Sequence, residues 1–185
     1  MKAIHCPDPG LVEAQIDCLF EDIQPAAVKI GMLANGAIIS RVAARLKHYQ
    51  ARNIVVDPVM LASSGQALLD PVALETLIHE VLPIARLYTP NLDEGACLLG
   101  SKPASSKEEM LSVAMHLQTL GGCPVLLKGG HLSTEERPDL ILDGGSDTHW
   151  FTCRCINANN PHINGSTVSA ANTTNHAQSH ASFKH

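Results

Sequence analysis

The chain has 185 residues, of which 45% are hydrophobic, so it can bury one sizeable core and its length favours one domain. Aromatic residues make up only 3%, which leaves the core to Leu, Ile, Val, Ala and Met, a composition common in α/β proteins with buried parallel strands. The formal net charge of -5 provides no basic surface and therefore argues against nucleic-acid binding.

The sequence shows no export or membrane signal. Six cysteines are scattered without a C-x-x-C pair or a secretory leader, which predicts reduced thiols in the cytoplasm. No apolar run approaches the ~20 residues that a membrane helix requires. We therefore expect a cytoplasmic protein without a membrane partner.

The first elements predicted along the chain are a helix, a strand and a second helix. Apolar residues at helical spacing occupy 11–20, and Pro25 ends that pattern before the buried stretch "AAVKIGML" at 26–33. Asn35 is a good N-cap for the helix that follows. No strand precedes this first helix, whereas an α/β domain usually opens with one, so we expect the chain to lack an N-terminal piece of a larger fold.

Strands and helices then continue to alternate. The predicted strands end at Met32, Met60, Thr89 and Lys128, roughly 30 residues apart, which is the size of a βαβ unit. The helices predicted between the later strands lie at 72–81, 94–99 and 107–120. This alternation predicts a doubly wound α/β fold, in which a mostly parallel sheet carries helices on both faces.

The pattern changes after Lys128. Apolar stretches on either side of the turn "DGGSDT" predict an antiparallel hairpin near residues 139–153. From Thr148 onward the chain contains no Asp or Glu, and residues 172–185 are predicted to form a polar, disordered tail. The exposed edges of an incomplete sheet would favour association into a homo-oligomer.

The residues that close the parallel strands are the candidates for chemistry, because ligands of a doubly wound sheet bind beyond the carboxyl ends of its strands. These strand ends are polar or rich in glycine. They supply Lys29, Gly31, Met32, Asp57, Met60, Asn91, Asp93, Glu94, Lys128, Gly129, Gly130 and His131.

Each candidate also has a plain structural explanation. Asn91 and Glu94 could hold the water shell of Mg²⁺ or could cap a helix. Lys128 before two glycines suits a phosphate group, but it would also suit a strand that ends in a glycine turn. Met32 could simply pack at the edge of the core, and Asp57 could form a turn.

The stretch "NPHINGSTVSAAN" at 160–172 reads as a loop that turns at Gly165 and then starts a helix. Such a turn presents backbone N–H groups and the positive end of the helix dipole, which together favour phosphate. A phosphate cradle usually carries more than one glycine, whereas Gly165 stands alone.

Five separated stretches resemble one known family in their order and spacing. They are "VKIGMLAN", "VVDPVMLASSGQALL", "LYTPNLDEGACLLG", "VLLKGGHL" and "DLILDG". The family is that of the hydroxymethylpyrimidine and phosphomethylpyrimidine kinases of thiamine biosynthesis, which have the ribokinase-like fold. Because the resemblance covers about 12–169, we interpret 1–171 as a partial kinase domain. It implies ATP- and Mg²⁺-dependent transfer of a γ-phosphoryl group to the hydroxymethyl group of an aminopyrimidine and then to its phosphate.

The resemblance also implies roles for single residues. Met32 would line the pyrimidine pocket, and Asp57 and Met60 would also bind substrate. Asp57 and Glu94 would serve the metal ion. The residues implied at the nucleotide are Asn91, Glu94, Lys128, Gly129 and Gly130.

The reacting groups depart from the family pattern. The family's glycine-rich opening segment, similar to G-x-D-P-S-G-G-A-G, has no counterpart before Leu11. Its T-H-G-T-G-C segment, whose cysteine is the base for the hydroxyl, is replaced at 161–166 by "PHINGS". The residues that the resemblance implies for catalysis in this chain are Lys128, Gly165 and Ser166. A serine hydroxyl is not appreciably ionised near neutral pH, so Ser166 is a poor substitute for that cysteine unless His162 activates it.

The sequence leaves three functions open. The first is a thiamine-pathway pyrimidine kinase, impaired by these departures. The second is a non-catalytic nucleotide-binding or interaction module derived from such a kinase. The third is an enzyme similar to pyridoxal kinase, although "DPVM" and "KGGH" favour the pyrimidine branch by resemblance.

Overall fold

The computed structural model describes residues 5–60, 69, 71–130, 132, 136–144 and 147–154. Several of the predictions lie outside the described residues. They concern His131, Gly165, Ser166, the domain boundary at 171 and the tail at 172–185.

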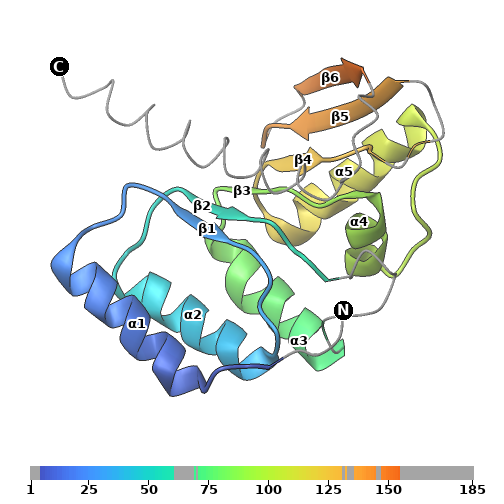
Figure 1. The fold of residues 1–185 in the computed structure, drawn as a ribbon. Helices are drawn as coiled ribbons and strands as arrows, with labels where there is room; N and C mark the ends of the chain where they lie inside the picture. Colours follow the sequence, from blue (N-terminus) through green and yellow to red (C-terminus); the bar gives the residue numbers. More distant parts are fainter. Residues whose placement is uncertain are drawn as a thin grey trace, which may run out of the picture.

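A six-stranded sheet forms the centre of the protein, with its strands in the order β1-β2-β3-β4-β5-β6 (Figure 1). The strands are β1 (Val28–Ile30), β2 (Ile54–Val56), β3 (Leu87–Tyr88), β4 (Val125–Leu127), β5 (Glu136–Leu142) and β6 (Thr148–Arg154). Strands β1 to β4 are parallel, whereas β5 and β6 are added antiparallel. The predicted α/β class, the mostly parallel sheet and the antiparallel hairpin are therefore confirmed.

Four helices of the described chain begin at side-chain caps, and two of these four end at glycines. The helices in the described ranges are α1 (Pro9–Asp22), α2 (Gly36–His48), α3 (Pro71–Thr76), η1 (Leu77–Val81), η2 (Leu82–Ile84), α4 (Leu92–Leu99) and α5 (Lys107–Gly121). Asn35 caps α2 as predicted, with its Oδ1 accepting from the N–H of Ile38 at 2.9 Å. Gly100 and Gly122 end α4 and α5 with φ of 61° and 67°, a conformation that glycine adopts without strain.

The helices of the described chain pack against one face of the sheet (Figure 1). Each parallel strand lies beside the next strand in the chain, so right-handed crossovers carry the connecting helices to the same side. Val56, Tyr88 and Val125 point to this side and share one buried cluster with Ile39 of α2 and Leu117 of α5. The sequence predicts helices on both faces, and within the described residues the second face carries none.

The opposite face of the sheet carries a smaller apolar cluster. Val55, Leu87 and Leu126 are buried there, and Ile141 packs against them. Side chains alternate between the two faces along each strand, so these residues lie between the helix-facing positions. The same alternation decides which strand-end residues share this second face.

Two segments differ from their predicted form. Strand β2 ends at Val56 rather than at Met60, because Pro58 has no N–H to donate and the N–H of Val59 turns back to the carbonyl of Asp57 at 2.7 Å. The helix predicted at 72–81 is α-helical in α3 and then widens to a π-helix in η1.

Two further predictions concern cysteines and membranes. Four cysteines of the described residues are free thiols: Cys6, Cys18, Cys97 and Cys123. Within the described ranges, no helix has the length and apolar character needed to cross a bilayer.

Candidate active site

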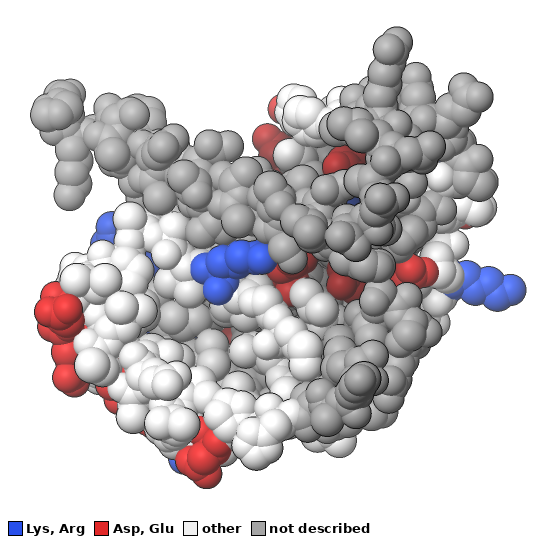
Figure 2. All heavy atoms as spheres, in the orientation of Figure 1, with Lys and Arg blue, Asp and Glu red and all other residues white. Residues whose placement is uncertain are grey.

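Polar side chains meet at the carboxyl ends of the parallel strands, on the face opposite to the helices. Asp57, Thr89 and Lys128 each directly follow a helix-facing strand residue and therefore point to the other side. Lys29 shares their face, because it pairs with Val55 in the register of β1 and β2. Figure 2 shows acidic and basic side chains next to one another near the centre of the view, where these strands end.

Asp57 is the centre of this cluster. Its side chain is buried, and its Oδ1 accepts hydrogen bonds from Lys128 Nζ at 2.8 Å and from Thr89 Oγ1 at 3.3 Å. Its Oδ2 lies 3.4 Å from Lys29 Nζ. A buried carboxylate is costly unless it is paired and hydrogen-bonded, and here two ammonium groups and a hydroxyl surround it. Asp57 therefore holds the ammonium groups of two lysines close together.

The two lysines retain the capacity to bind an anion. Each ammonium group has three donor hydrogens, and the side chains of Lys29 and Lys128 are 28% and 12% exposed. Together with Asp57 they carry one excess positive charge. This trio can attract a phosphate group without leaving its carboxylate unpaired.

Asn91 and Glu94 cap the start of α4, beside this cluster. The N–H of Asn91 donates to Glu94 Oε2 at 2.8 Å, and the N–H of Glu94 donates to Asn91 Oδ1 at 2.8 Å. The helix-capping explanation considered from the sequence is thus confirmed. Because one oxygen of Glu94 serves the cap, its other oxygen, Oε1, is the one that can face a cation.

Burial changes the pKa of the Glu94 carboxyl. The side chain is 4% exposed, and loss of solvent raises the pKa of its carboxyl from 4.5 to about 7. The hydrogen bond from Asn91 and the charge of Lys128 lower the pKa, but burial outweighs them. A divalent cation at Glu94 would favour the charged form.

The glycine turn after β4 adjoins Lys128. The N–H of Gly129 donates to Asp139 Oδ1 at 2.9 Å. A Cβ atom on Gly129 would lie 2.0 Å from the carbonyl oxygen of Pro138, so only glycine fits. A Cβ atom on Gly130 would meet no atom of the described chain within 4 Å, apart from its chain neighbours. The two glycines therefore have different environments.

The predicted substrate residues Met32 and Met60 lie in contrasting surroundings. The side chain of Met32 is 40% exposed, whereas that of Met60 is 2% exposed and belongs to the core cluster. Met32 can thus reach a ligand from the surface. Met60 packs in the core and is not accessible to a ligand at the surface.

The arrangement fits Mg²⁺ better than a fully protein-bound metal. In the described part of the chain, no three His, Cys, Asp or Glu side chains are grouped to hold a metal ion. Mg²⁺ usually keeps several waters and binds through one or two carboxylates together with substrate phosphates. Glu94 offers such a carboxylate, while Asp57 is already shared by two lysines.

The sequence did not single out Thr89 or Asp139 as site residues. The sequence predicts Thr89 only as the end of a strand, although its position next to Asp57 on the sheet edge follows from strand alternation. Asp139 opens the motif "DLILDG", but its partner Gly129 becomes evident only from the pairing of β4 with β5.

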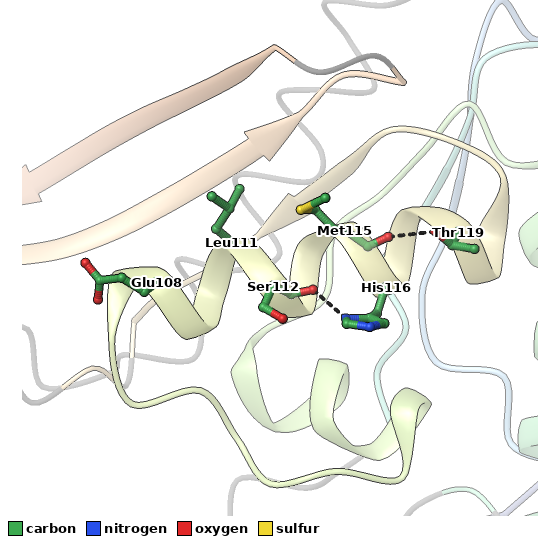
Figure 3. A pocket seen from close by; sticks show the side chains of 6 residues that line it. All are labelled: Glu108, Leu111, Ser112, Met115, His116 and Thr119. Carbon is green, nitrogen blue, oxygen red and sulfur yellow. Dashed lines mark hydrogen bonds between the residues drawn. The ribbon is translucent and has the colours of Figure 1, made fainter.

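A shallow hollow of about 430 Å³ lies elsewhere, on the outer surface of α5 (Figure 3). Its lining residues all come from one helix: Glu108, Leu111, Ser112, Met115, His116 and Thr119. His116 Nδ1 lies 2.7 Å from the carbonyl oxygen of Ser112 within the same helix. The hollow shares no residue with the strand-end cluster and brings no reactive groups together.

An α/β sheet that gathers lysines, carboxylates and a glycine turn at its carboxyl edge is typical of proteins that bind phosphate esters with a divalent cation. The sequence matches the family model of phosphomethylpyrimidine kinase over residues 1–184. The chain therefore belongs to the phosphomethylpyrimidine kinase family, and the resemblance inferred from its motifs is confirmed.

A curated relative and two solved structures illustrate this similarity. The hydroxymethylpyrimidine/phosphomethylpyrimidine kinase of Escherichia coli (strain K12) is 42% identical over 171 residues, which are 92% of this chain and 64% of the relative. The phosphomethylpyrimidine kinase of Clostridium difficile 630 superposes with a TM-score of 0.74 at 31% identity, covering 94% of this chain and 78% of that one. The pyridoxal kinase of Staphylococcus aureus in complex with AMP-PCP and pyridoxal gives a TM-score of 0.85 at 30% identity, covering 95% and 62%. The chain thus spans less than two thirds of the Escherichia coli relative.

Proposed function

We propose that the chain carries out, or is the core of a protein that carries out, ATP- and Mg²⁺-dependent phosphorylation of hydroxymethylpyrimidine and its monophosphate. The observation that carries this proposal is the pair of Lys128 with Asp57, next to the turn at Gly129 and Gly130 and beside Glu94. Phosphoryl transfer depends chiefly on positioning and on neutralising negative charge, and this cluster supplies groups for both.

The nucleotide would lie along the strand-end cluster. Lys128 would bind phosphate oxygens, and the backbone at Gly130 would allow close approach. Asn91 and Glu94 would complete this side of the site at the N-terminus of α4, where the helix dipole favours negative charge. The complex of the Staphylococcus aureus relative with AMP-PCP supports a nucleotide at this fold.

Glu94 would be the principal ligand for Mg²⁺, directly or through water. When bound, the ion would neutralise charge on the transferring phosphates. Asp57 would act at longer range, because it already holds Lys29 and Lys128. Its role would be to keep the two ammonium groups in place.

The acceptor would be a small aminopyrimidine. Met32 would cover its ring, and Asp57 would lie near its reacting end. Met60 would support the pocket from the core. Lys128 would stabilise the charge that develops during transfer, with Gly165 helping to hold phosphate. Ser166 would be the weak point, because its hydroxyl is a poor base near neutral pH.

Pyridoxal kinase activity is the second candidate. Its support is the higher TM-score of the Staphylococcus aureus pyridoxal kinase, 0.85, against 0.74 for the Clostridium difficile phosphomethylpyrimidine kinase. The family model and the 42% identity to the Escherichia coli relative favour the pyrimidine. A non-catalytic nucleotide-binding module is the remaining alternative. In each case we propose a cytoplasmic protein.

An ADP-release assay separates these functions. The chain is incubated with ATP and Mg²⁺ and with either hydroxymethylpyrimidine or pyridoxal, in parallel with the Ser166→Cys variant. We expect slow turnover of the pyrimidine and faster turnover by the variant. ADP binding without turnover by either protein would identify the non-catalytic module. Absence of any ADP or ATP binding would refute all of these nucleotide-dependent functions.

A further inference from the structure

The start of β5 lies beside the end of β4, which is the strand that leads into the glycine turn. These strands are antiparallel, and Leu127 of β4 pairs with Leu140 of β5. Continuing this register places Asp139 across from Lys128 and Pro138 across from Gly129. The antiparallel partner thus reaches the carboxyl edge of the parallel strands, where the candidate site lies.

Two contacts from β5 fix Gly129. Asp139 Oδ1 accepts from the N–H of Gly129 at 2.9 Å, and the carbonyl oxygen of Pro138 occupies the space that a side chain on Gly129 would need. The carbonyl of Gly129 in turn accepts from the N–H of Leu132 at 2.9 Å. Gly129 is therefore held on its amide, its α-carbon and its carbonyl.

Gly130 differs from Gly129 in the surroundings of its α-carbon. No heavy atom of the described residues, its chain neighbours aside, would come within 4 Å of a Cβ atom placed there. The open space next to Lys128 is thus on the Gly130 side of the turn. Because the amide of Gly129 is already bonded to Asp139, a ligand would approach the backbone at Gly130 instead.

The partner of the Gly129 N–H is a partly buried carboxylate. Asp139 is partly buried, and loss of solvent raises the pKa of its carboxyl, against the opposing effects of the Gly129 N–H and of Lys128. Desolvating a carboxylate carries a cost, so a residue kept only for packing would be cheaper as an apolar side chain. The carboxylate instead makes a strong, directed hydrogen bond to the turn.

We propose that Asp139 is a positioning residue for the phosphate-binding turn: it holds the amide of Gly129 inward so that Lys128 and Gly130 face the polyphosphate of a nucleotide. This inference rests on the proposed nucleotide-binding function. It adds a residue from the antiparallel hairpin to a site otherwise built at the ends of parallel strands.

The test measures the Kd of ADP with Mg²⁺ for the full chain and for three variants. Asp139→Ala removes the acceptor, Asp139→Asn keeps an acceptor oxygen without the charge, and Asp143→Ala removes an exposed acid beyond the other end of β5. Asp139→Ala removes a charged acceptor, whose hydrogen bonds are stronger than those of neutral acceptors, so we expect it to raise the Kd by about tenfold or more. We expect Asp139→Asn, which keeps a neutral and therefore weaker acceptor, to raise the Kd by less than Asp139→Ala does, and Asp143→Ala to stay within about threefold.

Hydrogen exchange on the unaltered chain provides a second readout that needs no variant. The Gly129 amide of ¹⁵N-glycine-labelled protein should exchange as slowly as strand amides, because Asp139 occupies it. Fast exchange, native affinity in Asp139→Ala, or equal losses in Asp139→Ala and Asp139→Asn would each overturn the positioning role. If the unaltered chain binds no ADP while the Gly129 amide is protected, the proposed function fails, and the nucleotide part of this inference fails with it.

Discussion

The Nζ atom of Lys128 lies 2.8 Å from Oδ1 of Asp57, and this pair joins the ends of β2 and β4 across β3. Thr89, at the end of the intervening strand, donates to the same oxygen. Three neighbouring strands are thus tied together at their carboxyl ends by one carboxylate. Stability and phosphate binding should therefore depend on the same few side chains.

Replacing Asp57 with Asn should destabilise the chain. The change removes the charge that balances Lys29 and Lys128, and removing one partner of a buried ion pair costs several kcal/mol when the other charge stays buried. The two lysines are partly solvated, so we expect the free energy of unfolding to fall by about 2 to 3 kcal/mol. Urea denaturation would measure this loss. Asp143→Asn, at an exposed position, is the control; an equal effect of the two substitutions would contradict the pairing described here.

The two lysines should contribute unequally. Lys128 is less exposed than Lys29 and lies closer to Asp57. We expect Lys128→Met to lower the free energy of unfolding by roughly 2 kcal/mol and Lys29→Met by about 1 kcal/mol or less. Lys128→Met should also weaken ADP binding more than Lys29→Met. Chemical denaturation and ADP titration of both variants test whether Lys128 contributes more than Lys29. A larger effect of Lys29→Met in both measurements would contradict this prediction.

The position of the site could be predicted from the sequence because it follows from two general rules. Ligands bind beyond the carboxyl ends of parallel strands, and the residues that close those strands can be read directly from the chain. Asp57, Glu94 and Lys128 are predicted in this way as candidate site residues. The motifs around them also predicted the family.

The contacts between these residues could not be predicted in the same way. Asp57 read as a turn former or a metal-site residue, whereas the register of the sheet makes it the partner of two lysines. Asp139 belongs to the motif "DLILDG", but its proximity to Gly129 depends on how β5 pairs with β4. Strand register is a long-range property, and a local pattern does not contain it.

Stability should depend on pH through Glu94. In the folded chain its carboxyl has a pKa of about 7, against 4.5 for an ordinary glutamate. Between these values the folded state binds more protons than the unfolded state, so this contribution to stability is complete below about pH 4.5 and is lost as the pH rises through about 7. The gap of about 2.5 pH units corresponds to roughly 3 kcal/mol.

The Glu94→Gln variant isolates this effect, because glutamine can keep the capping box without a titratable group. Unfolding free energies at several pH values should show a flatter profile from about pH 4.5 to 7 and a more stable protein at pH 8. Glu109 provides a matched control, since it accepts from Ser105 at the start of α5 but is exposed, and its hydrogen bonds lower its pKa. Glu109→Gln should not produce the same flattening. An unchanged pH profile for Glu94→Gln would contradict the raised pKa.

Alanine should reduce stability when it replaces Gly129, and nucleotide affinity when it replaces Gly130. In Gly129→Ala the new Cβ atom would lie 2.0 Å from the carbonyl oxygen of Pro138, so strand β5 must move and we expect a loss of about 2 kcal/mol or more in the free energy of unfolding. In Gly130→Ala the methyl group enters open space, so stability should stay within about 0.5 kcal/mol of the unaltered chain. The same methyl group would stand where a nucleotide approaches, and ADP affinity should fall by about tenfold. Thermal unfolding of the two variants measures the packing effect, and ADP titration measures the effect on nucleotide binding. Native ADP affinity in a folded Gly130→Ala protein would show that the nucleotide does not approach the turn at this residue.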